Sequence, residues 1–121
     1  MNKKTKQDIR TELLNGLSIY YDSLREYEHL SSTSLHIASL TQDQRKFVRD
    51  CIEAIDELEL DPNMSVRNYS FLVLDQLKHV KSKQKNIIPA TFREVDAILE
   101  SAIPQEILLE YKQALTWQSD V

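Results

Sequence analysis

The chain has 121 residues, of which 41% are apolar and 28% are charged. This is the size and balance of one globular domain with a single core, and the apolar content excludes an intrinsically disordered chain. One glycine and three prolines leave little material for tight hairpin turns, which favours helices over antiparallel strands. A formal net charge of −4 disfavours a broad phosphate-binding surface and leaves a local basic patch open. We therefore expect a single helical domain across residues 1–121.

The first predicted helix spans residues 6–28, where apolar residues recur at intervals of three and four. Its stripe consists of Ile9, Leu13, Leu17, Tyr20, Leu24 and Tyr27. Gly16 lies inside this helix, where glycine costs about 1 kcal/mol relative to alanine. The residue marks either a close helix crossing or simple tolerance. The hydroxylated run at 31–34 then predicts a loop.

The second helix is expected to begin at a capping box, Thr41 to Gln44, and to run to about Glu59. Residues 35–40 could form a short helical turn before it. Ser65 is the predicted N-cap of a third helix. This third helix has apolar residues on several sides of its axis: Val66, Tyr69, Phe71, Leu72, Val73, Leu74, Leu77 and Val80. A helix of that kind must be covered on several sides, so we place it at the centre of the fold.

Two shorter helices complete the chain. A second capping box, Thr91 to Glu94, predicts a helix that ends at Ala102, and Pro104 can begin the last one. No repeat links the helices, and their short connections favour antiparallel neighbours. The sequence therefore predicts an all-α, compact antiparallel bundle of four to five helices, with the third helix, about 65–84, at its centre.

A cluster of acids at the end of the second helix is the leading candidate for a binding site. It consists of Asp50, Glu53, Asp56, Glu57, Glu59 and Asp61. Negative charge at a helix C-terminus opposes the helix dipole, so local stability would not select it. In an antiparallel helix pair this end meets Arg67 and lies away from the lysines further along the third helix. We expect it to bind another protein with a basic surface.

DNA binding is the first alternative. Residues 41–80 can be aligned with a helix-turn-helix in which Arg67, Asn68 and Tyr69 open the recognition helix. A basic run could add contacts to nucleic acid or another anion: Lys78, Lys81, Lys83 and Lys85. The apolar third helix and the acids before it weaken this interpretation.

A metal-binding bundle or an enzyme is the second alternative. Glu26 and His29 have the Glu-x-x-His spacing of bundle metal sites, but the chain has no second copy of this motif. Cys51 lies in an apolar stripe beside Asp50 and Glu53, which oppose formation of a thiolate. There is no phosphate-binding loop, zinc-type cysteine pair or HExxH motif. We therefore expect no catalytic site, metal or cofactor.

The leading hypothesis is a non-enzymatic protein–protein interaction module, such as an adaptor, inhibitor, chaperone or immunity-type factor. Tyr21, Tyr111 and Trp117 are candidate interface aromatics. The single cysteine cannot form an internal disulfide, and no stretch approaches the roughly 18 apolar residues of a membrane span. We expect a cytoplasmic protein, either monomer or homodimer, without membrane contact.

Overall fold

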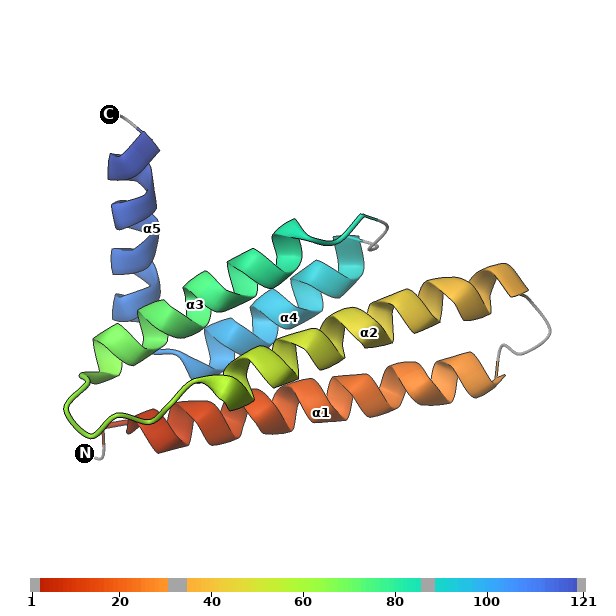
Figure 1. Ribbon diagram of the computed structural model, residues 1–121, viewed down its shortest axis with the longest axis horizontal. Helices are drawn as coiled ribbons and strands as arrows, with labels where there is room; N and C mark the ends of the chain where they lie inside the picture. Colours follow the sequence, from red (N-terminus) through yellow and green to blue (C-terminus); the bar gives the residue numbers. More distant parts are fainter. Residues whose placement is uncertain (1–2, 31–34, 86–88, 120–121) are drawn as a thin grey trace.

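The computed structural model describes residues 3–30, 35–85 and 89–119 of the chain. These residues form five helices and no strand: α1 (Lys6–Leu30), α2 (Leu35–Glu57), α3 (Val66–Ser82), α4 (Pro89–Ala102) and α5 (Gln105–Ser119). Helices α1 to α4 run in alternating directions, and α5 then turns steeply away from the others (Figure 1). The predicted all-α antiparallel bundle is confirmed. No helix in these ranges is long and apolar enough to cross a membrane.

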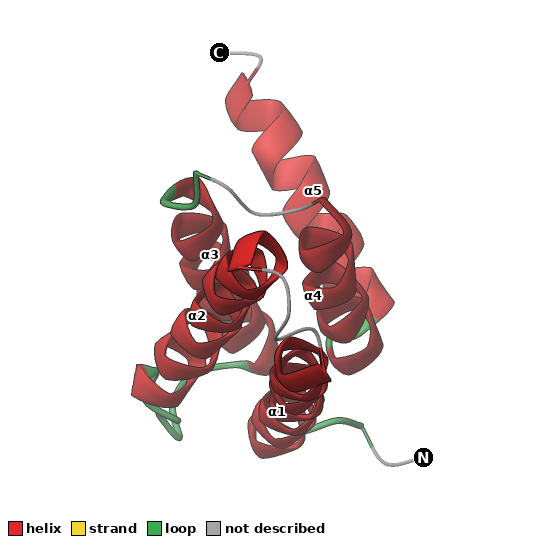
Figure 2. Cartoon of the chain, turned by 90° about the vertical axis from the view of Figure 1, so that its right-hand side faces the viewer, coloured by secondary structure: helices red, strands yellow, loops and turns green. Residues whose placement is uncertain are grey.

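The core is built from the apolar stripes that the sequence predicts. On α1, Ile9, Leu13 and Leu17 are at most 1% exposed. The buried face of α2 consists of Phe47, Val48, Cys51 and Ile55. These two helices pack against each other, and the end-on view shows α2 and α3 on one side of the bundle, α4 on the other and α1 below (Figure 2). Burial of these side chains is the main force that holds the bundle together.

Helix α3 has neighbouring helices on several sides, as its apolar residues predict. It packs against α1, α2 and α5, and it reaches α4 through an ion pair between Lys81 and Asp96. Tyr69, Val73 and Leu77 face the core with at most 1% of their surface exposed. The predicted N-cap is also confirmed, because the Ser65 hydroxyl accepts a hydrogen bond from the Asn68 amide at 3.0 Å.

The predicted start of the second helix is wrong. Helix α2 begins at Leu35, and Thr41 lies in its interior rather than at a cap. Residues 35–40 contain no glycine or proline, so nothing in them prevents the helix from including them. The predicted loop at 31–34 lies outside the described residues. The Thr41 capping box is a local pattern that this longer helix overrides.

The fourth helix also starts before its predicted cap. Pro89 is its first residue, a position that proline favours, and Thr91 is 1% exposed within the first turn. At the fifth helix the difference is one residue. Pro104 lies just before α5, and its carbonyl accepts hydrogen bonds from the amides of Ile107 and Leu108.

Gly16 marks a close helix crossing, one of the two interpretations that the sequence left open. A Cβ atom at this position would lie 2.8 Å from Cγ2 of Ile98 on α4. Nearby, Lys4 clamps the end of α4 by donating from Nζ to the carbonyls of Ser101 and Ala102, at 3.1 and 3.0 Å. Both contacts hold α4 against α1.

We predict that Gly16→Ala lowers the free energy of unfolding by about 1 kcal/mol, since overpacking against Ile98 outweighs the better helix propensity of alanine. In an Ile98→Ala background the same change should raise that free energy, because the obstructing methyl is gone. Urea denaturation of the four variants measures both effects. Stabilisation by Gly16→Ala in the native background would contradict the close crossing.

Val73→Asp or Leu77→Asp should unfold the protein, because each change buries an unpaired charge at a cost of more than about 4 kcal/mol. Gln76→Asp on the exposed side of α3 is the matched control and should leave the helical circular dichroism intact. A folded Val73→Asp variant would show that α3 is not central.

Candidate functional site

The predicted acidic site lies where expected, at the end of α2 and in the connection after it. Glu53, Asp56, Glu57, Glu59 and Asp61 are all exposed, and Asp50 is half-buried. We call these six residues the acidic end. Three of them, Asp56, Glu57 and Glu59, line an open, shallow depression together with Gln7 and Arg10 of α1.

The cation that neutralises part of the acidic end is Arg10, not Arg67 as predicted. Arg10 Nη2 lies 2.8 Å from Asp56 Oδ1, and Nη1 donates to the Leu58 carbonyl at 3.1 Å. The guanidinium therefore also satisfies carbonyls at the C-terminus of α2, where a positive charge is favourable. The sequence of α2 alone could not predict this contact, because Arg10 lies on α1, far from Asp56 in the sequence.

Three glutamates of the acidic end keep their charge uncompensated. Among the described residues, Glu53, Glu57 and Glu59 make no ion pair within 4.0 Å. Asp61 is engaged differently: its carboxylate accepts from the Asn63 amide at 2.9 Å, and its carbonyl accepts from Lys6 Nζ. Uncompensated negative charge is therefore confined to fewer residues than the six acids of the acidic end suggest.

Arg67 is engaged at the junction of α3 and α5. Its Nε lies 2.8 Å from Glu110 Oε1, and its guanidinium stacks 4.3 Å from the centre of the Phe71 ring. The other elements also differ from a helix-turn-helix. Residues 58–65 form a longer connection than the usual turn of about three to four residues, and α2 and α3 lie antiparallel (Figure 1). DNA binding stays a prediction, with these features against it.

The lysines of the basic run near the end of α3 differ in exposure and in their partners. Lys81 is half-buried and paired with Asp96 of α4, and its Nζ lies 5.8 Å from the Phe92 ring centre. Lys78, Lys83 and Lys85 are exposed. Lys83 is the C-cap of α3, where its charge complements the helix dipole. Only part of the predicted cluster is therefore available to an anion.

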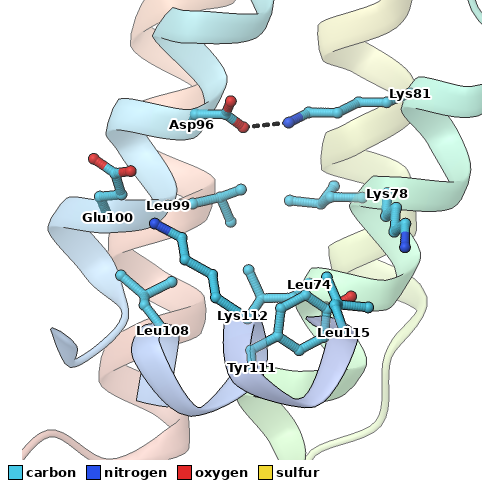
Figure 3. A pocket seen from close by; sticks show the side chains of 11 residues that line it. Leu74, Lys78, Lys81, Asp96, Leu99, Glu100, Leu108, Tyr111, Lys112 and Leu115 are labelled. Carbon is cyan, nitrogen blue, oxygen red and sulfur yellow. Dashed lines mark hydrogen bonds and ion pairs between the residues drawn. The ribbon is translucent and has the colours of Figure 1, made fainter. Parts of the chain in front are cut away.

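A groove between α3, α4 and α5 is the feature that the sequence did not reveal (Figure 3). Its volume is about 320 Å³. The apolar lining consists of Leu74, Leu77, Leu99, Leu108, Tyr111 and Leu115, and the polar lining of Lys78, Lys81, Asp96, Glu100 and Lys112. We refer to it as the leucine groove. The available hint was the apolar surface on several sides of α3, but its position depends on the steep turn before α5.

Tyr111 anchors one end of the leucine groove. Its hydroxyl donates to Asp75 Oδ1 at 2.6 Å, and its ring meets Phe71 edge-on with centroids 5.2 Å apart. Burial, together with the bond to Asp75, raises the pKa of Tyr111 above its ordinary value. Tyr21, another predicted interface aromatic, is half-buried under Arg45, and the Trp117 side chain lies outside the described part of the structure.

The candidates for chemistry gain no support from the geometry. Cys51 has no exposed surface, and burial raises the pKa of its thiol to about 12, so the nucleophilic thiolate is disfavoured at neutral pH. Glu26 is exposed, and the side chains of His29 and His36 lie outside the described part. Within that part, no three His, Cys, Asp or Glu side chains are grouped as metal ligands would be.

We predict that Arg10→Gln lowers the free energy of unfolding by about 1–2 kcal/mol, because the α2 carbonyls and Asp56 lose a charged donor. Arg49→Gln is the control, since Arg49 is exposed on α2, and it should change stability by less than about 0.5 kcal/mol. Thermal and urea denaturation check both. Equal, small effects would show that the Arg10 contacts do not stabilise the helix end.

Comparison with models of protein families, with curated proteins and with solved structures finds no match for this chain. Its function must therefore be inferred from its own surfaces. Two of them have the exposure and chemistry of docking sites: the acidic end of α2 and the leucine groove.

Proposed function

We propose that this chain is a non-enzymatic protein–protein interaction module that binds a protein with a basic surface through the acidic end of α2. An adaptor, inhibitor, chaperone or immunity-type factor would work in this way. The observation that carries the proposal is the uncompensated charge of Glu53, Glu57 and Glu59. Their neighbours Asp56 and Asp61 already have partners within the fold.

The free chain bears an energetic cost at this surface. Glu53 and Glu57 are four residues apart on α2, so their side chains are neighbours on the same face and repel by a few tenths of a kcal/mol. Both also lie toward the negative pole of the helix. Lysines or arginines of a partner would relieve both effects, and this gain would appear only in the complex. Charges of this kind mainly accelerate encounter and select the partner.

A cytoplasmic location belongs to the same proposal. The single cysteine is buried in the core, where a reduced thiol serves as a small apolar side chain. A chain that needs no disulfide suits a reducing compartment.

The test is affinity purification of the tagged chain from its native host, followed by measurement of binding to each enriched protein. The triple variant Glu53→Lys, Glu57→Lys, Glu59→Lys should weaken binding of a basic partner by at least about tenfold. Binding of the native chain should also weaken as salt is raised.

The matched control reverses three exposed glutamates elsewhere, Glu26, Glu94 and Glu106, and therefore changes the net charge equally. It should bind as the native chain does. Equal loss in both variants would indicate a non-specific charge effect. No enriched protein, or no loss in the first variant, would overturn the proposal.

A further inference from the structure

We propose that the leucine groove between α3, α4 and α5 binds an acidic amphipathic helix of a partner protein. This surface is separate from the acidic end of α2, and it would recognise a partner of opposite charge. Three observations lead to it: the apolar floor, the helical walls and the excess of lysine along the edges.

The floor has the composition of a helix-binding site. Five leucines from three different helices line it together with Tyr111 (Figure 3). Leu108, Leu115 and Tyr111 are only partly buried, so α5 leaves apolar surface open to solvent along the groove. Apolar side chains spaced at i, i+3 or i+4, and i+7 on a partner would cover that surface.

The walls determine which kind of segment can enter. All three are α-helices, whose interior backbone amides and carbonyls are bonded within each helix, so the groove offers no strand edge for β-augmentation. An occupant must therefore satisfy its own backbone hydrogen bonds. A helix does this and presents a continuous apolar stripe at the same time.

The edges determine the sign of the partner's charge. Lys81 and Asp96 lie across the groove from each other and form an ion pair. The remaining charges are Lys78 and Lys112 against Glu100, and neither lysine forms an ion pair within the described residues. The balance is positive, so glutamates or aspartates beside the apolar stripe of the partner complement it.

The experiment is a selection of displayed peptides against the full chain. The library consists of amphipathic helices about 18 residues long, with fixed leucines at i, i+4, i+7 and i+11 and with flanking positions that vary among Glu, Gln and Lys. Glutamate should be enriched at the flanking positions. Enrichment of lysine, absence of any preference, or absence of binders would overturn the proposal.

Variants then place the selected peptide in the groove. Lys78→Glu with Lys112→Glu should weaken its binding at least about tenfold, and Lys46→Glu with Arg49→Glu, a reversal on the exposed side of α2, should not. Leu108→Ser tests the floor, with Leu109→Ser as control because Leu109 is 52% exposed and does not line the groove. Binding that survives all groove variants would exclude this site.

Two further measurements test for a second copy in the groove and for independence of the two proposed surfaces. If the chain alone forms a homodimer that Leu108→Ser dissociates, a second copy fills the groove and the proposal is overturned. The triple lysine variant of Glu53, Glu57 and Glu59 should bind the peptide like the native chain. If the native chain binds the peptide but no basic partner, only the proposal for the acidic end fails; if it binds a basic partner but no peptide, only the proposal for the leucine groove fails.

Discussion

The lack of a side chain at Gly16 sets the distance between α1 and α4. Because Gly16 has no Cβ, Ile98 can lie directly against the backbone of α1. Helix α4 packs more extensively against α1 than against any other helix, so this crossing determines where α4 stands. The leucine groove depends on it in turn, since Leu99, Asp96 and Glu100 of α4 form one of its walls.

The two proposed surfaces have different origins in the fold. The acidic end arises because acids gather on the exposed side of α2 near its C-terminus and in the connection after it. Arg10 of α1 pairs with Asp56, and Lys6 donates to the Asp61 carbonyl. The leucine groove arises because α5 turns away from the other four helices (Figure 1) and leaves Leu108, Tyr111 and Leu115 only partly buried. One surface is defined by charge within a short segment, and the other by the packing of three helices. A chain with both properties would have the means to contact two partners of opposite charge.

Most of the fold could be predicted from the sequence because long amphipathic periods report burial directly. Ile9, Leu13 and Leu17 recur at helical spacing and are buried, and Ser65 caps α3 because its hydroxyl acts on the next residues along the chain. The starts of α2 and α4 were predicted wrongly since a Thr-x-x-Gln or Thr-x-x-Glu pattern stabilises a terminus only where the preceding residues are not helical. In both places the preceding residues continue the helix.

The candidate site was less predictable because its contacts join distant segments. Asp56 forms an ion pair with Arg10, and Arg67 with Glu110. Neither ion pair produces a periodic pattern in the sequence from which it could be predicted. The leucine groove is even harder to predict from the sequence. Leu74, Leu99 and Leu115 each have the appearance of ordinary core residues, and only the direction of α5 leaves a space between them.

The hydrogen bonds between Lys4 and the end of α4 affect the order in which parts of the chain fold. The hydrogen bonds from Lys4 to Ser101 and Ala102 span 97 and 98 residues, whereas α1 and α2 are consecutive helices that can pair as a local hairpin. Contacts of such long sequence separation form late, because closing the intervening loop costs entropy before they are gained. During synthesis on a ribosome, the first helical hairpin would emerge before α4, and the surface around Gly16 would stay exposed until α4 has emerged.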